Sequence, residues 1–303
     1  MKRTVATGRS ELGQQRFWYW RGWRVRYTYL RPDDPVAQQR TPILLIHGFG
    51  ASLEQWRSNL RDWGRCRPVY ALDLLGFGHS QKPAVLLGAD LWQTQIYDFW
   101  QALIAQPVIL TGHSLGALVA LTAAARHPAM ANRLILLTLP LARQELVAGW
   151  LARLARGVEG LFATPLLLRP LFAVVRQPSL IRKVLTGIYQ QPERVDEGLV
   201  ELFTRPTLER GAARTLCYLV KSRTQAEFSD ATADLLNQVS VPILLLWGSQ
   251  DRVLPVAWGR QILAANPGIT YREIEGAGHC LFDEVPGAIQ DAVDVWLAKG
   301  GSP

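Results

Sequence analysis

The sequence has only three cysteines and no uninterrupted apolar run of membrane-spanning length. Cys66, Cys217 and Cys280 are odd in number and widely spaced, which excludes a disulfide framework and a metal site with cysteine ligand spacing. Residues 1–15 are basic but contain no apolar segment, so they do not resemble a secretory signal. We therefore expect a cytoplasmic protein.

Acidic residues are in the minority. There are 25 Asp and Glu against 33 Lys and Arg, which gives a net charge of +8. No nucleic-acid-binding motif accompanies this charge, so we predict no nucleic-acid partner. Nearly half of the 303 residues are apolar (49%), which is ample for a large core. A single α/β domain with one insertion accommodates this length.

Short apolar runs alternate with helical patterns over most of the chain. Strands are predicted at 17–20, 23–29, 42–46, 67–72, 107–111, 133–138, 241–246 and 270–274, and helices at 91–105, 117–125 and 286–299. Such alternation is typical of a mostly parallel sheet with helices on both faces. The first two strands, on either side of Gly22, are predicted to form an antiparallel hairpin.

The pattern changes between residue 139 and about residue 240. This segment is rich in Leu, Ala and Arg, and its prolines would divide it into short helices. We predict a core of residues 1–138 and 241–303 and a helical cap of residues 139–240. A cap at the carboxyl edge of the sheet would exclude water and shape a substrate pocket. The alternative is an insertion with a purely structural role.

The strongest functional signal is the sequence Gly-His-Ser-Leu-Gly at 112–116. It follows an apolar strand-like run and precedes an Ala-rich helical segment. A serine between two glycines at a strand-to-helix turn is the pattern of a nucleophile elbow. The glycines allow strand and helix to approach closely while the hydroxyl of Ser114 is held above the sheet. Ser114 is therefore the predicted nucleophile.

A serine nucleophile needs a base and an orienting acid. The predicted base is His279, which lies in a glycine-rich loop after the strand at 270–274. The predicted acid is Asp251, which follows the apolar run at 241–246. The other four histidines lie in turns, at a helix end or at the variable elbow position. The order Ser, Asp, His along the chain is the one expected for this kind of triad.

A candidate oxyanion hole follows the strand at 42–46. The turn His47-Gly48-Phe49-Gly50 can direct backbone N–H groups towards a developing negative charge. The predicted donors are the N–H groups of Phe49 and of Leu115, the residue after the nucleophile. The alternative is an ordinary glycine-rich turn.

These motifs together resemble those of the α/β-hydrolase superfamily. The matching segments are HGFGAS (47–52) with Trp56, DLLGFGHS (73–80), GHSLG (112–116), WGSQD (247–251) and GAGHC (276–280). The resemblance implies an α/β-hydrolase fold in which an inserted helical cap covers a mostly parallel sheet. It also implies a triad of Ser114, Asp251 and His279.

A narrower resemblance is to the pheophytinase-like hydrolases of cyanobacteria and plastids. It is carried by DLLGFGHSQKP, by the Trp-rich opening at 18–22 and by the ending GHCLFDEVP. Members of that branch are taken to hydrolyse esters of hydrophobic molecules such as chlorophyll breakdown products. Related chains often carry Pro and another residue after GHC, where this chain has Leu281 and Phe282.

The chemistry expected from these residues is hydrolysis of a bulky hydrophobic ester through an acyl-enzyme, with no metal and no organic cofactor. A carbon–carbon bond hydrolase and a cofactor-free perhydrolase would use the same triad. A non-catalytic descendant that binds lipid or pigment is a further alternative. Serine at the elbow argues against dehalogenase and aspartate-type epoxide hydrolase chemistry, both of which need a carboxylate nucleophile.

The cap segment also suggests a partner. Between residues 141 and 183 basic residues outnumber acids and alternate with Trp, Leu and Phe. A basic face beside an apolar one can bind an anionic membrane surface. The alternative is a solvated lid whose apolar face covers the pocket. The oligomeric state is not predicted.

Overall fold

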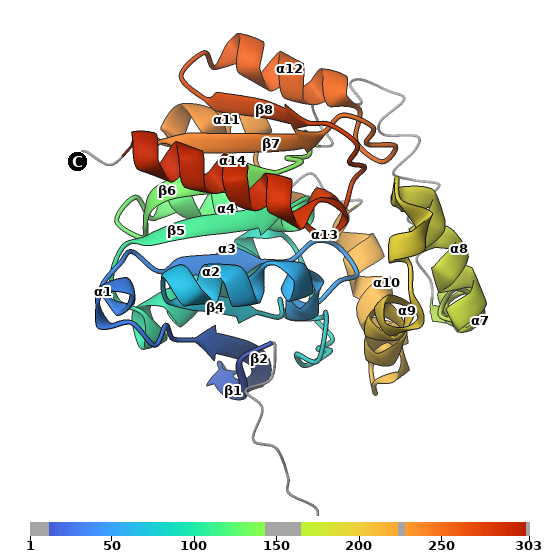
Figure 1. The fold of residues 1–303 in the computed structure, drawn as a ribbon. Helices are drawn as coiled ribbons and strands as arrows, with labels where there is room; N and C mark the ends of the chain where they lie inside the picture. The colour runs from blue at the N-terminus through green and yellow to red at the C-terminus, as the bar shows by residue number, and fades with distance from the viewer. Residues whose placement is uncertain (1–11, 143–164, 224–227, 301–303) are drawn as a thin grey trace, which may run out of the picture.

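A computed structural model describes residues 12–142, 165–223 and 228–300 of the protein. In this part of the chain eight strands form one sheet with the order β1-β2-β4-β3-β5-β6-β7-β8 (Figure 1). The strands are β1 (Gln14–Trp20), β2 (Trp23–Leu30), β3 (Ile43–Ile46), β4 (Val69–Leu72), β5 (Val108–His113), β6 (Ala131–Leu137), β7 (Ile243–Gly248) and β8 (Thr270–Ile274). Strand β2 pairs antiparallel with β1 and β4, and all other neighbours pair parallel. The predicted hairpin and mostly parallel sheet are confirmed.

The central strands are buried on both faces, because side chains alternate across a sheet. In β3, Leu44 and Ile46 belong to one hydrophobic core, whereas Ile43 and Leu45 belong to a second core on the opposite face. Each of these side chains is almost completely buried. Full burial of an aliphatic side chain stabilises the folded state by roughly 1.5–3 kcal/mol. The continuous apolar runs in the sequence therefore favour strands that are covered on both faces.

Helices cover both faces of the sheet (Figure 1). The first core is closed by α3 (Ala89–Leu103), α4 (Leu115–Arg126), α11 (Thr232–Gln238) and α12 (Val256–Ala265), and the second by η1 (Leu53–Ser58), α2 (Leu60–Cys66), α13 (Leu281–Glu284) and α14 (Pro286–Lys299). Local residues set several helix starts. Asp34 accepts hydrogen bonds from the first N–H groups of α1 (Pro35–Gln38), and Pro286 occupies the first turn of α14.

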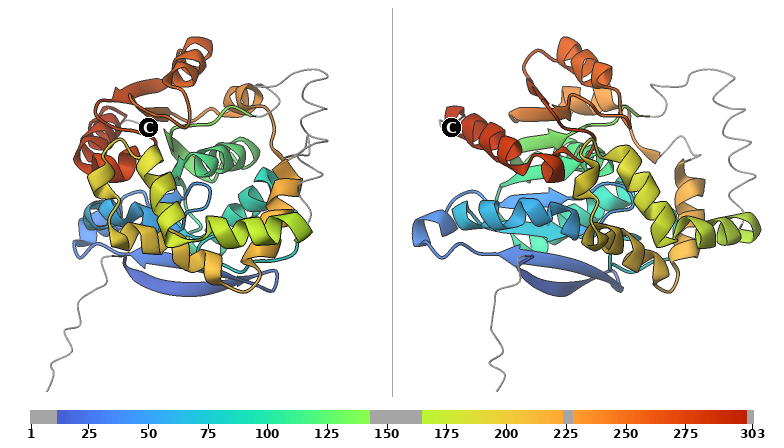
Figure 2. Two further views of the ribbon diagram at one scale, coloured as in Figure 1. Left: turned by 90° about the vertical axis from the view of Figure 1, so that its right-hand side faces the viewer. Right: turned by 45° about the vertical axis from the view of Figure 1, so that its right-hand side comes forward.

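Four helices lie beyond the carboxyl ends of the parallel strands, as Figures 1 and 2 show. They are α7 (Pro165–Val175), α8 (Pro178–Ile188), α9 (Glu197–Thr204) and α10 (Ala212–Arg223), with the short 3₁₀ helices η2 (Pro192–Arg194) and η3 (Arg205–Leu208) between them. Helix α11 also belongs to the segment predicted as a cap, but its Leu235 and Leu236 pack in the first core. No helix in the described residues is both long and apolar enough to cross a bilayer.

A buried carboxylate, Asp73, connects three segments at the carboxyl edge of the sheet. Its Oδ2 accepts a hydrogen bond from Arg26 Nε on β2 at 2.7 Å and another from the N–H of His79 at 2.7 Å. Its Oδ1 accepts from the N–H of Leu53, also at 2.7 Å. Burial alone would raise the pKa of Asp73, but the charge of Arg26 and these hydrogen bonds hold the pKa below its ordinary value.

We predict that Asp73→Ala lowers the free energy of unfolding by about 3–5 kcal/mol, because it leaves the buried Arg26 without its main counter-charge. The wild-type contribution should be present at neutral pH and be lost in acid as the pH falls below 3.8 through the lower folded-state pKa. Urea unfolding at several pH values measures both effects. Asp62→Ala removes an exposed partner of Arg65 and should cost less than about 1 kcal/mol. Equal costs for the two variants would contradict this role of Asp73.

Candidate active site

Ser114 lies at the sharp turn between β5 and α4, as the sequence predicted for an elbow. Its backbone has φ 52° and ψ −119°, a conformation that residues other than glycine rarely adopt. The turn also requires glycine on both sides of the serine. A Cβ on Gly112 would lie 2.2 Å from the carbonyl oxygen of Gly116, and a Cβ on Gly116 would lie 2.3 Å from the carbonyl oxygen of Ile46. Such strain is typical of functional sites.

Asp251 and His279, the predicted acid and base, are hydrogen-bonded to each other. Asp251 Oδ2 accepts a hydrogen bond from His279 Nδ1 at 2.8 Å, and the Asp251 side chain is completely buried. The second carboxylate oxygen accepts from the N–H groups of Val253 and Leu254 at 2.7 and 2.9 Å. These bonds fix the carboxylate in one orientation. With Nδ1 committed to Asp251, a neutral His279 presents Nε2 as a proton acceptor.

The structure brings the loop of His279 against the elbow. His113, the residue before Ser114, donates from Nε2 to the carbonyl oxygen of His279 at 3.0 Å, and the two imidazole rings lie 4.7 Å apart. Burial, reinforced by the neighbouring His279, holds the pKa of His113 well below its ordinary value. His113 therefore remains neutral and serves to hold the His279 loop beside β5.

The loop after β3 carries Phe49 and is held by two side chains. His47 Nδ1 donates to the carbonyl oxygen of Gly48 at 2.7 Å, while His47 Nε2 accepts from the N–H of Leu74 at 2.9 Å. Gln55 accepts from the N–H of Gly48 at 3.0 Å. Complete burial lowers the pKa of His47, so its ring is neutral and its tautomer is fixed by these partners.

Leu115, the second predicted donor, is the first residue of α4. Its backbone N–H therefore belongs to the positive end of that helix, where the first amides have no partner within the helix. Because Gly116 packs against the carbonyl groups that end β3, the start of α4 and the Phe49 loop are neighbours. Both predicted donors thus lie at the carboxyl edge of the sheet.

The remaining histidines have other partners. His127 ends α4, stacks on Tyr97 and contacts Gln93 at 3.0 Å. His79 pairs with Glu209, 130 positions later in the chain, rather than with a neighbouring residue. Among the described residues there is no cluster of three or more His, Cys, Asp or Glu side chains that could bind a metal ion.

Sequence reasoning missed one carboxylate next to the site. Glu284 is buried and accepts hydrogen bonds from the backbone N–H groups of Gln190, Gln191 and Gly278 at 2.7–3.1 Å. Burial raises its pKa even though these N–H groups oppose the shift. Because Gly278 precedes His279, Glu284 connects the segment after α8 to the loop of the predicted base. Only its position in GHCLFDEVP signalled it, and that motif gave no role for the acid.

A cavity of about 320 Å³ lies between the Phe49 loop and the helices beyond the sheet. Its wall is almost entirely apolar. It is formed by Phe49 and the Gly76–Gly78 turn on the core side and by side chains of α7, α8, α9, η3 and α10, including Phe172, Val184, Leu185, Phe203, Leu216 and Leu219. A site of this size and composition suits an apolar organic group.

Comparison with known proteins fits this geometry. A model of the α/β hydrolase fold matches residues 41–286. The chain belongs to the α/β hydrolase fold family. An uncharacterised protein of Mycobacterium tuberculosis is 30% identical to this hydrolase-fold chain over 267 residues, which span 86% of this chain and 76% of that protein.

Two further matches concern proteins with a stated activity. The chloroplastic pheophytinase of Arabidopsis thaliana is 27% identical over 332 residues, covering 90% of this α/β hydrolase and 64% of that protein. The crystal structure of a membrane phospholipase A, described as a bacterial virulence factor, aligns with a TM-score of 0.74 at 25% identity and covers 96% of this chain and 88% of that one. The resemblance to the superfamily and to pheophytinase is confirmed.

We predict that Gly116→Ala destabilises this α/β hydrolase by about 1–3 kcal/mol, because the new methyl group would overlap the carbonyl groups that end β3. Alanine normally stabilises a helix relative to glycine by up to about 1 kcal/mol. Gly187→Ala in α8 is the matched control, since nothing lies within 4 Å of its added Cβ. Thermal unfolding of both variants provides the measurement. A Gly116→Ala protein as stable as Gly187→Ala would refute the close approach.

Proposed function

We propose that this α/β hydrolase is a serine esterase that cleaves a bulky hydrophobic carboxylic ester through an acyl-enzyme. The observation that carries the proposal is the 2.8 Å hydrogen bond between a buried Asp251 and His279, in a loop held against the Ser114 elbow. This combination supplies a nucleophile, a base and an orienting acid at one edge of the sheet.

In the proposed reaction Ser114 Oγ attacks the ester carbonyl while His279 Nε2 takes the hydroxyl proton. Asp251 stabilises the imidazolium and keeps the proton of Nδ1 in place. The N–H groups of Phe49 and Leu115 stabilise the oxyanion of the tetrahedral intermediate. When the intermediate collapses, the carbon–oxygen bond to the leaving alcohol breaks and His279 returns its proton to that alcohol. Water, deprotonated by His279, then hydrolyses the acyl-enzyme.

The substrate class follows from the cavity beside Phe49. A wall that is mostly apolar but includes Lys82 and Arg176 favours a long or bulky hydrocarbon group. Pheophytinase and the membrane phospholipase A, whose names both indicate hydrophobic substrates, support this assignment. We propose that α7–α10 act as the cap that encloses this group.

His47 has a positioning role in this mechanism. The carbonyl group of Gly48 and the N–H group of Phe49 belong to one planar trans peptide unit, so they point in opposite directions. By donating to the Gly48 carbonyl, His47 fixes the direction of the Phe49 N–H. A preorganised donor stabilises an oxyanion more strongly than one that must reorient during the reaction.

A fluorophosphonate probe tests the proposed chemistry. Wild-type protein should be labelled on Ser114 and should hydrolyse p-nitrophenyl esters, with kcat/KM rising from acetyl to longer acyl chains. Ser114→Ala should abolish labelling and lower ester turnover by about 10⁴-fold or more while the circular dichroism spectrum stays unchanged. A folded wild-type protein that is neither labelled nor active would favour a non-catalytic binder. Labelling with turnover only of vinylogous diketones would favour a carbon–carbon hydrolase, and labelling with ester-dependent peracid formation from peroxide would favour a perhydrolase.

For His47 we predict that His47→Gln lowers kcat by about 10- to 100-fold with little change in KM, because the Phe49 N–H would be misdirected only in the transition state. Affinity for an alkylboronic acid, which forms a tetrahedral adduct on the serine, should fall in parallel. His127→Gln, at the far end of α4, is the control and should leave both quantities unchanged. If His47→Gln reduced thermal stability but left kcat and boronate affinity at wild-type values, the role of His47 would be structural only.

A further inference from the structure

The cavity opens on an exposed apolar surface formed by α7 and α8. Val175 and Val184 line the cavity and are also exposed to solvent, so they mark its mouth. Next to them on α7, Leu171 and Val174 expose 56% and 53% of their surface although they do not line the cavity. Single exposed apolar residues are common, but four on adjoining helices at a cavity mouth indicate an interaction surface.

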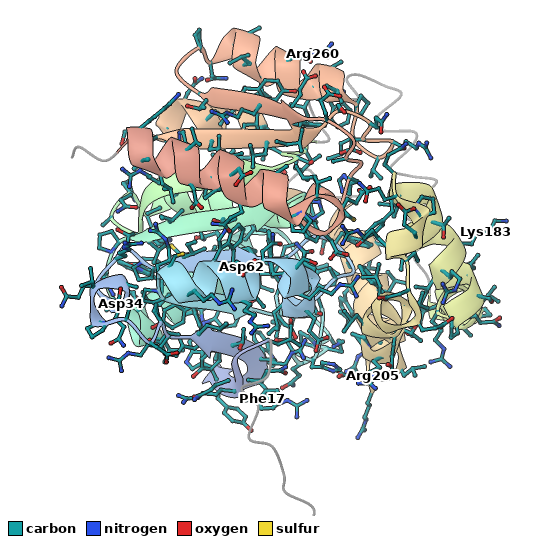
Figure 3. The ribbon with its side chains drawn as sticks, viewed as in Figure 1. Phe17, Asp34, Asp62, Lys183, Arg205 and Arg260 are labelled. Atoms are coloured by element: carbon teal, nitrogen blue, oxygen red, sulfur yellow. The ribbon has the colours of Figure 1, made fainter. Side chains whose placement is uncertain are left out.

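The segment that forms this surface carries basic but no acidic side chains. Residues 160–192 contain four basic side chains and no Asp or Glu. Arg182 is paired with Glu197 of α9. For Arg176 and Lys183, in contrast, no ion pair occurs with any residue of the described chain, and Lys183 points away from the body of the molecule (Figure 3). The surface therefore combines exposed aliphatic side chains with two cations that have no ion-pair partner among the described residues.

Three basic residues of the segment 141–183, Arg143, Arg153 and Arg156, lie outside the described residues. The inference therefore rests on α7 and α8 alone. Aliphatic side chains flanked by Arg and Lys are complementary to the boundary between acyl chains and anionic headgroups of a lipid bilayer. A protein partner of the same shape would need matching acidic side chains around an apolar ridge.

We propose that Leu171, Val174, Val175 and Val184, with Arg176 and Lys183, form a docking surface for an anionic lipid bilayer. On docking, the cavity mouth would face the acyl-chain region, so a hydrophobic ester could pass into the cavity without crossing water. This second step rests on the proposed function, whereas the docking itself does not.

The test uses the full-length protein and extruded vesicles of phosphatidylcholine alone or mixed with phosphatidylglycerol, which makes the vesicle surface negative. Wild-type protein should co-sediment with the anionic vesicles, bind pure phosphatidylcholine weakly, and dissociate as salt rises. Leu171→Asp/Val174→Asp should lower the partition coefficient by about tenfold or more. Lys183→Glu should weaken binding to anionic vesicles only. Val295→Asp, at an exposed valine on α14, is the matched control and should bind like the wild type.

Several results would overturn the proposal. One is absence of co-sedimentation with either vesicle, and another is equal binding by the double variant and the control. If the wild type is a dimer without lipid and Leu171→Asp/Val174→Asp makes it a monomer, the surface is an interface between copies. If the double variant lowers thermal stability and leaves vesicle binding unchanged, the surface is packed within the chain.

Ser114→Ala separates this proposal from the enzymatic one. It should bind vesicles like the wild type and have no esterase activity. Vesicle binding without activity in the wild type would leave the docking surface standing and refute the esterase. Leu171→Asp/Val174→Asp should hydrolyse a soluble short-chain ester at the wild-type rate, because neither side chain lines the cavity.

Discussion

The arrangement of the whole site depends on two close approaches of polypeptide backbone, each possible only at glycine. At the elbow, Gly116 packs against the carbonyl groups of Ile46 and His47, which places the start of α4 beside the loop after β3. On the other side, a Cβ on Gly248 would lie 2.1 Å from the carbonyl oxygen of Gly278. The first approach joins the nucleophile to the predicted oxyanion donors, and the second joins the strand before Asp251 to the loop of His279. Backbone contacts of this kind leave side chains free for chemistry.

The three histidines near the site, His47, His113 and His279, differ in their hydrogen-bond partners. His47 and His113 are buried, and burial lowers the pKa of each ring. His47 holds the carbonyl of the next residue, Gly48, whereas His113 holds the carbonyl of His279 in another loop. His279 differs because it alone among them has a carboxylate partner.

Most of the fold, and the meeting of Asp251 with His279 beside the Ser114 elbow, could be predicted because their signals are local. An apolar run predicts a buried strand, and the helix predicted at 286–299 is observed at those positions because Pro286 begins it. The ends of helices that depend on the backbone conformation of one residue were predicted less accurately. Helix α3 begins after Gly88 and ends before Ala105, whose φ is 53°, rather than spanning 91–105. The hydrogen bonds from Arg26 to Asp73 and from Gly278 to Glu284 were missed. The sequence around each of these charged residues does not distinguish it from a charged residue at the surface.

The position of helices α7–α10 was the least predictable part for a related reason: it depends on a few contacts between residues that are distant in the sequence. On one side, Glu209 pairs with His79 and with the buried Lys82 of the core. On the other, the hydroxyl group of Tyr189 donates to Asp283 at 3.0 Å, and Glu284 binds the segment after α8 and the N–H of Gly278. The second set of contacts includes Gly278, the residue before His279. Glu284 thus joins the segment that follows α8 to the loop of the predicted base through backbone hydrogen bonds, which no local sequence pattern reveals.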